Sequence, residues 1–169
     1  MFYIELKKDI LLGHYDSEDE SVSEAVFSIY PDYENYEFII HLNNDLKLLL
    51  DFRGDMSEIY NDVIKMMRAI NHGDGMIKIN FLSSSFSAIW HIEIKSDDIK
   101  IIPQWTTANL EFKGKKVTPD KYHKFESPII ITKALLLSEW NKLLEEIKND
   151  LLKVGYPHNL KGFDYLMNL

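Results

Sequence analysis

Apolar residues occupy every second position in many short segments of this chain, and this alternation restricts what it can fold into. A period of two places apolar side chains on one face of an extended strand, which is typical of a half-buried antiparallel sheet. The segments predicted as strands are residues 2–6, 10–15, 24–30, 36–42, 46–52, 76–81, 86–95, 99–105 and 110–112. A helix that starts at Asn44 would also fit residues 46–50.

Residues 56–72 have the spacing of a helix instead. Their apolar side chains recur at intervals of three and four residues. Asp55 and Glu58 form a capping-box pattern before them, and Gly73 suits a left-handed C-terminal cap. The pattern therefore predicts a helix with one apolar stripe.

A second helix is predicted over residues 139–154, with Ser138 as its N-cap and Gly155 as its end. Residues 128–137 fit either a buried strand or an early start of this helix, and we favour the strand. The remaining tail, residues 156–169, is expected to lie over the sheet through two apolar side chains, Phe163 and Leu166.

The order of these elements, strands, helix, strands and helix, predicts an α+β fold. We expect a mainly antiparallel sheet of about six to nine strands with two principal helices on one side. Residues 24–30 and 36–42 are predicted to pair as a hairpin through a turn at Pro31 and Asp32, and residues 10–15 to pair with the first strand. The acidic, serine-rich residues 17–23 are predicted to form an exposed loop.

Length and composition restrict the class of protein. A chain of 169 residues fits one globular domain, residues 1–169. The chain has no cysteine, which excludes disulfides, thiolate metal sites and a cysteine nucleophile. No apolar run reaches the ~18 residues of a membrane span, and the N-terminal residues lack the pattern of a secretory signal. We therefore expect a cytoplasmic protein without a membrane partner.

The charge of the chain is strongly segregated. Residues 9–46 contain ten acidic and no basic side chains, which leaves 17 acidic and 19 basic side chains elsewhere. The sequence predicts an acidic end and a mildly basic flank that contains Lys95, Lys100, Lys113, Lys115, Lys116, Lys121 and Lys124. Only two of the 19 basic residues are arginines, the favoured ligands of phosphate, so we do not expect nucleic acid as a partner.

Tyrosines are interleaved with the carboxylates of the acidic segment, and this combination suits a protein interface. Tyrosine is enriched among interface hot spots, and carboxylates attract a basic partner. A solvated acidic surface that only aids solubility is the alternative. The residues expected to bind a basic protein partner are Asp16, Glu18, Asp19, Glu20, Glu24, Asp32, Tyr33, Glu34, Tyr36 and Glu37.

The sequence contains none of the usual catalytic motifs, and we predict a protein that is not an enzyme and needs no cofactor or metal. His91 and Glu93 alternate on a predicted strand and share one face, where they could contribute to a metal or catalytic site. His72 and Asp74 form a weaker candidate in a glycine-containing loop. An enzyme that uses either pair remains an alternative.

The segment Pro128–Ile131, the following Leu137–Trp140 and the helix after them resemble the final strand and helix of several immunity proteins of bacterial toxin systems, including contact-dependent growth inhibition. The size and composition of the whole chain are also similar to that family. The resemblance implies a cytoplasmic antidote that binds and blocks a cognate toxin domain, often a nuclease with a basic cleft. A protein-binding module of a phage or mobile element is the alternative.

Overall fold

The computed structural model describes residues 1–7, 10–32, 37–73 and 75–169. In these residues nine strands form two antiparallel sheets, accompanied by helices, and the predicted α+β class is confirmed. The strands divide between two sheets, where the sequence predicted one. Most of the buried apolar side chains join one continuous core.

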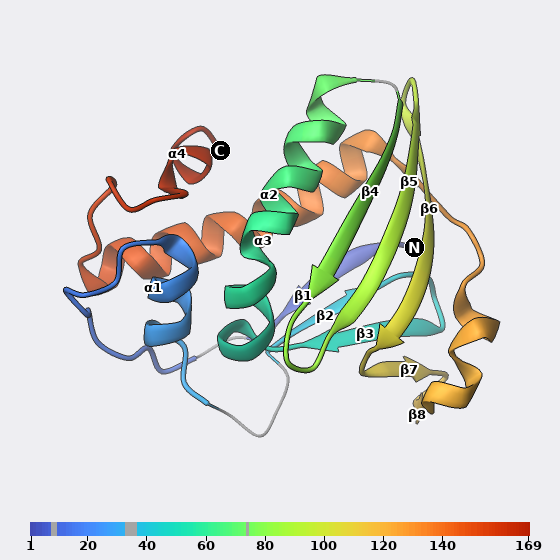
Figure 1. Ribbon diagram of the computed structural model, residues 1–169, viewed down its shortest axis with the longest axis horizontal. Coiled ribbons are helices and arrows are strands. Elements are labelled where there is room, and N and C mark those ends of the chain that lie inside the picture. The colour runs from blue at the N-terminus through green and yellow to red at the C-terminus, as the bar shows by residue number, and fades with distance from the viewer. Residues whose placement is uncertain (8–9, 33–36, 74) are drawn as a thin grey trace.

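The five-stranded sheet has the order β1-β2-β3-β7-β8, and the four-stranded sheet has the order β4-β5-β6-β9. The first contains β1 (Tyr3–Leu6), β2 (Phe38–His41), β3 (Leu46–Leu50), β7 (Leu110–Phe112) and β8 (Lys115–Lys116). The second contains β4 (Gly75–Leu82), β5 (Ser87–Lys95), β6 (Asp98–Thr107) and β9 (Ile129–Thr132). The chain passes from one sheet to the other between β3 and β4, between β6 and β7, and between β8 and β9. Figure 1 shows the long strands β4–β6 standing beside α2.

The strands of the four-stranded sheet follow the predicted alternation. Along β5, Ala88, Trp90, Ile92 and Ile94 are buried, whereas His91 between them is exposed. The buried face belongs to the core that α2 (Ser57–His72) also enters through Ile59, Val63 and Met67 and their neighbours. The opposite face of this sheet carries mainly polar side chains with a few exposed apolar ones.

The hairpin predicted from residues 24–30 and 36–42 is wrong, because the first of these segments is the helix α1 (Val22–Ile29). Ser21 and Glu24 form a capping box: the Ser21 hydroxyl accepts from the Glu24 N–H at 3.3 Å, and the Glu24 carboxylate accepts from the Ser21 N–H at 2.9 Å. The buried positions of α1 are Val22, Ala25, Val26 and Ile29, which follow the helical period. Residues 10–15 form no strand either, and β1 pairs with β2.

The helix predicted over residues 56–72 is confirmed as α2, but its start differs. A five-residue π-helical turn, η1 (Phe52–Met56), precedes it, and Asp51 caps that turn by accepting from the Asp55 and Gly54 N–H groups. The side chain of Asp55 accepts from the Asp51 N–H at 3.2 Å, so the reciprocal capping pair is Asp51 with Asp55. The predicted pair of Asp55 with Glu58 is therefore wrong. Gly73 has a positive φ of 127° but is not left-handed helical, because its ψ is −159°.

The last long helix, α3 (Lys133–Val154), starts earlier than predicted. Thr132 is its N-cap and accepts from the Leu135 N–H at 3.3 Å, so residues 128–137 divide into the strand β9 and the first turn of α3. Gly155, in the left-handed conformation, ends the helix as predicted.

The tail after α3 contains a short helix, α4 (Phe163–Met167), and it lies against other helices, where the sequence predicted contact with the sheet. Phe163 and Leu166 are fully buried. The Tyr60 hydroxyl of α2 donates to the Gly162 carbonyl at 2.8 Å, and Arg68 of α2 forms an ion pair with Asp164 at 2.6 Å. Between β8 and β9 the chain forms the 3-10 helix η2 (Pro119–Phe125), with Tyr122 buried.

Candidate protein-binding surface

We define the acidic loop as residues 15–21 together with Glu24 of the first turn of α1. Tyr156, which follows the C-cap of α3, holds this loop in place. The Tyr156 hydroxyl accepts from the Asp16 N–H at 3.1 Å and donates to the Asp19 carboxylate. Tyr15 packs edge-on against the Tyr156 ring, with 4.8 Å between the ring centroids. Burial, reinforced by the hydrogen bond to Asp19, raises the pKa of Tyr156 to about 12, so its hydroxyl keeps its proton at neutral pH.

Backbone hydrogen bonds fix the other end of the acidic loop. The Lys161 N–H donates to the Glu20 carbonyl at 3.1 Å, and the Val22 N–H donates to the Lys161 carbonyl at 3.0 Å. The hydrogen bond from Ser21 is the largest cause that lowers the pKa of Glu24, with further help from the Glu20 N–H. The carboxylate of Glu24 is therefore charged at neutral pH and points where the capping box holds it.

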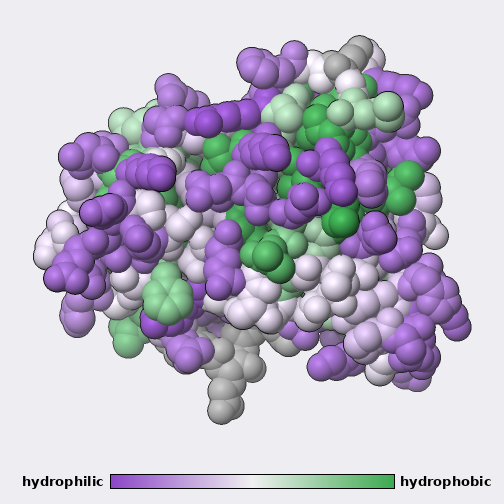
Figure 2. All heavy atoms as spheres, viewed as in Figure 1, coloured by the Kyte–Doolittle hydropathy of each residue, from purple (hydrophilic) through white to green (hydrophobic). Residues whose placement is uncertain are grey.

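Four carboxylates of the acidic loop are exposed and one is half-buried. Asp16, Glu18, Glu20 and Glu24 are exposed, whereas Asp19 also accepts from the Ser28 hydroxyl at 3.2 Å. Figure 2 shows the end of the molecule around α1 covered largely by hydrophilic side chains. The arrangement can attract and bind cationic side chains of another molecule, because these charges face solvent on a backbone that is already ordered.

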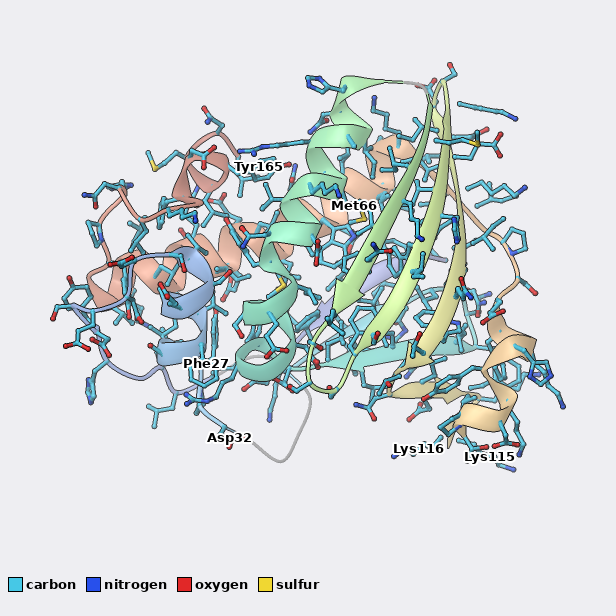
Figure 3. All side chains as sticks on the ribbon, viewed as in Figure 1. Phe27, Asp32, Met66, Lys115, Lys116 and Tyr165 are labelled. Carbon is cyan, nitrogen blue, oxygen red and sulfur yellow. The ribbon has the colours of Figure 1, made fainter. Side chains whose placement is uncertain are left out.

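The remaining predicted interface residues do not join this cluster. Asp32 is exposed beyond the C-terminal end of α1, and a helix of eight residues separates it from the acidic loop by about 12 Å. Figure 3 shows Asp32 near Phe27, with Lys115 and Lys116 of the basic flank at the opposite end of the molecule. Three predicted residues, Tyr33, Glu34 and Tyr36, lie outside the described residues.

Glu37 is buried, only 1% exposed, so its carboxyl group is not at the surface. Its Oε2 accepts from the Phe52 N–H at 2.9 Å, and among the described residues its Oε1 has no hydrogen-bond partner. Burial raises the pKa of the Glu37 carboxyl group above its usual value. Glu37 therefore supports η1 from within the core, and we remove it from the candidate surface.

Two aromatic residues near the acidic segment have different roles. Tyr30 is fully buried, stacks on Phe52 with 4.2 Å between the centroids, and donates to the Asp150 carboxylate at 2.7 Å. Phe27 is 48% exposed, and the Arg53 guanidinium lies over its ring at 3.9 Å from the centroid. The predicted strand placed Phe27 on one face with Ala25 and Ile29, whereas the helical period of α1 buries those two residues and exposes Phe27.

A buried carboxylate that the sequence did not identify anchors the turn between β4 and β5. Asp55 is fully buried and accepts from the hydroxyls of Ser83 at 2.5 Å and of Ser85 at 2.8 Å. Burial is the largest influence on the pKa of Asp55 and raises it, although the two serine hydrogen bonds act in the opposite direction. The three consecutive serines, residues 83–85, were the available signal. This cluster joins η1 to the four-stranded sheet and serves the fold.

The two histidines considered for catalysis, His72 and His91, are exposed. His91 is exposed, and Glu93 forms ion pairs with Lys95 at 2.6 Å and with Lys100 at 4.0 Å. The hydrogen bond from Lys95 lowers the pKa of Glu93. His72 is exposed at the end of α2, and its predicted companion Asp74 is outside the described residues. Within the described residues, no group of three or more His, Asp or Glu side chains could hold a metal ion.

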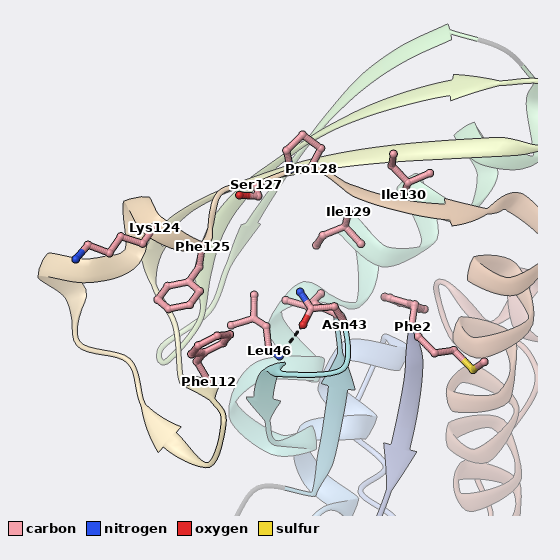
Figure 4. Close-up of a pocket in the computed structure, with 12 residues that line it drawn as sticks. Phe2, Asn43, Leu46, Phe112, Lys124, Phe125, Ser127, Pro128, Ile129 and Ile130 are labelled. Atoms are coloured by element: carbon pink, nitrogen blue, oxygen red, sulfur yellow. Dashed lines mark hydrogen bonds between the residues drawn. The ribbon is translucent and has the colours of Figure 1, made fainter.

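A pocket of about 390 Å³ lies between the β2–β3 turn and the segment that leads into β9 (Figure 4). Its walls are mainly apolar, and the rings of Phe112 and Phe125 are 5.1 Å apart between centroids. Its lining residues include no carboxylate and no histidine, with Lys124 as the charged side chain among them. The pocket therefore offers apolar surface and no acid–base pair.

Comparisons of the chain with protein-family models, with curated proteins and with solved structures gave no match. Among the described residues, no helix combines the length and the apolar character needed to cross a membrane. The functional conclusion therefore depends on the chemistry of the surface, in which the acidic loop is the most concentrated charged feature.

Proposed function

We propose that this protein is a cytoplasmic immunity-type inhibitor that binds a cognate toxin domain, a basic nuclease, and neutralises it by stoichiometric binding. The observation that carries the proposal is the acidic loop, where Asp16, Glu18, Glu20 and Glu24 face solvent together. The resemblance of the segment 128–140 and the helix after it to immunity proteins supports the same function.

The order of the acidic loop favours binding. Tyr156 holds its middle and the backbone of Lys161 holds its end, so little conformational entropy is lost when a partner arrives. A nuclease cleft is basic because it binds phosphate, and a carboxylate-rich surface occupies the same electrostatic field. Tyr15, 47% exposed beside these carboxylates, adds an aromatic contact of the kind enriched at interfaces.

The charge distribution also favours one orientation of the complex. Lys115 and Lys116 lie at the opposite end of the molecule from α1 (Figure 3). A basic partner is therefore attracted to one end and repelled from the other, which increases the fraction of productive encounters.

The test starts from the gene upstream of this one, whose C-terminal domain is expected to be compact and basic. Co-expression of that domain with this protein should give a one-to-one complex and remove the toxicity of the domain. A variant with Asp16→Lys, Glu18→Lys and Glu20→Lys should fail to protect cells. The matched control, Asp45→Lys, Asp98→Lys and Glu146→Lys, changes the net charge equally at exposed positions elsewhere and should protect normally.

Two results would contradict the proposal. If the neighbouring domain does not bind this protein, the immunity function is wrong. If the acidic-loop variant and the control variant protect equally well, the acidic loop is not the binding surface.

A further inference from the structure

The strand β4 forms one edge of the four-stranded sheet, and the proposed function assigns no role to this edge. In the part of the chain that the structure describes, β4 is paired only with β5, although it is eight residues long. An unpaired edge strand presents a row of backbone N–H and C=O groups that can pair with another strand. We propose that two copies of this protein pair through β4, antiparallel and in the register centred on Ile79, to form a continuous eight-stranded sheet.

The other sheet edges carry the protection that β4 lacks. At β1, the side chain of Glu139 from α3 accepts from the Ile4 N–H at 2.9 Å and so occupies the edge. At the opposite end of that sheet, β8 has only two residues, and both are lysines. At β9, a four-residue strand follows Pro128. Short strands, charges, proline and a covering helix are the devices that prevent edge-to-edge pairing.

Along β4 these devices are reduced to one charge. Its sequence, Gly75–Leu82, contains no proline and a single charged residue, Lys78. Its register with β5 is regular from Gly75 to Leu82, without a bulge that would twist the edge away. Figure 1 shows the strand running along the side of α2, with α1 on the other side of that helix. Pairing at β4 therefore leaves the acidic loop of each copy accessible.

The exposed side chains of β4 select the register. Met76 is 85% exposed and Leu82 is 71% exposed, so both side chains are accessible to an added strand. Antiparallel pairing about Ile79 places Met76 opposite the partner's Leu82 at both ends of the interface. It also places Lys78 opposite the partner's Asn80, so that no like charges are directly opposed.

Other symmetric registers are less favourable. Centring the pair on Lys78 would oppose the two ammonium groups directly, and centring it on Asn80 would place Lys78 against the partner's Leu82. A register shifted by one residue from any of these would place the buried side chains of one strand opposite the exposed side chains of the other. The register about Ile79 is the one that matches apolar with apolar and polar with polar along the whole strand, in the isologous manner of a two-fold dimer.

The test measures the mass of the full chain by sedimentation equilibrium over a range of concentrations. The wild-type protein is expected at about 40 kDa, twice the 19.9 kDa of the chain. Met76→Lys alone and Leu82→Glu alone should each weaken dimerisation at least about tenfold, because each places a charge against an apolar side chain. The double variant should dimerise again, because each introduced ammonium group then faces an introduced carboxylate.

Ile130→Glu is the matched control, since Ile130 is 74% exposed on β9 at the other edge of the same sheet. It should leave the dimer intact. A wild-type chain that stays at 19.9 kDa at every concentration would overturn the inference, as would a control variant that dissociates like the β4 variants or a double variant no better than the single ones.

A cross-link provides a second, covalent readout of the register. The chain has no cysteine, so Lys78→Cys combined with Asn80→Cys introduces the only two thiols. Directly opposed antiparallel residues have Cα atoms about 4.5–5.5 Å apart, within the range of a disulfide. Oxidation should give a covalent dimer from the double variant and much less from Lys78→Cys alone. Equal cross-linking of both would reject the register.

Discussion

Replacing Glu139 by alanine tests the way in which α3 protects the first sheet. The Glu139 carboxylate is buried, only 5% exposed, and accepts from the Ile4 N–H at 2.9 Å. Removing it leaves a buried backbone donor without a partner, which costs about 1–3 kcal/mol. Alanine is the better helix former, so the change in helix propensity acts in the opposite direction and cannot explain a loss.

We therefore expect Glu139→Ala to lower the free energy of unfolding by about 2 kcal/mol and the Tm by about 4–8 °C. Urea unfolding followed by tryptophan fluorescence measures the free energy, and an unchanged m-value shows that the unfolded state is comparable. Glu139→Gln should recover most of the stability, because its amide oxygen still accepts from Ile4.

The control for this prediction is Lys142→Ala, which removes the exposed partner of the Glu139–Lys142 ion pair. An exposed partner contributes little, so this variant should lose no more than about 0.5 kcal/mol. The reasoning is refuted if Glu139→Gln is as unstable as Glu139→Ala, or if Lys142→Ala accounts for the whole loss.

Three further predictions concern burial, capping and the surface histidine. Burial raises the pKa of Glu37 in the folded state above its unfolded value of about 4.3. As the pH rises between these two pKa values, the unfolded state loses the proton first, so the free energy of unfolding of the wild type decreases. The stability of Glu37→Gln relative to the wild type should therefore increase with pH across that interval, and a difference that stays constant would contradict this. Thr132→Ala removes the N-cap of α3 and should lower the free energy of unfolding by about 1 kcal/mol, measured by thermal unfolding. Ser138→Ala, inside α3, should change this free energy by less than about 0.5 kcal/mol. Equal losses in the two variants would contradict the assignment of Thr132 as the cap. His91→Ala should leave binding and protection unchanged, and a loss of function with the fold intact would revive the enzyme alternative.

Local patterns were sufficient for the strands β4, β5 and β6 and for the helix α2. The strands β4, β5 and β6 alternate regularly and are joined by tight turns, so that each segment carries its own signal. The helix α2 was equally clear because its apolar stripe is long. Sequence periodicity does not identify neighbouring strands, and the division into two sheets depends on long-range pairing such as that of β3 with β7.

The error at α1 arises where two local patterns compete. In residues 24–30 the apolar positions Ala25, Phe27 and Ile29 fit a strand, but the capping box of Ser21 with Glu24 and the helical spacing from Val22 decide for a helix. The acidic residues around Ser21 obscured that cap, since they were interpreted as a charged loop.

Tertiary contacts explain the part of the candidate surface that could not be predicted. Glu37 and Asp55 look like ordinary surface carboxylates in the sequence, yet both are buried by elements distant from them in the chain. Glu37 is buried where β2 meets Phe52, and Asp55 is buried by the serines of the β4–β5 turn. The acidic loop was recognisable because its charge excess is local, whereas the role of Tyr156 in holding it depends on a contact across 140 residues.

The central claim is that the acidic loop binds a basic toxin domain, and the salt dependence of that affinity tests it most directly. The Kd of the domain encoded upstream should be measured for the wild type and for the variant with Asp16→Lys, Glu18→Lys and Glu20→Lys, at low and high ionic strength. We expect the variant to bind at least about tenfold more weakly at low salt and the difference to shrink at high salt, because exposed charges are screened. Equal affinities of the two proteins at low salt would contradict the claim.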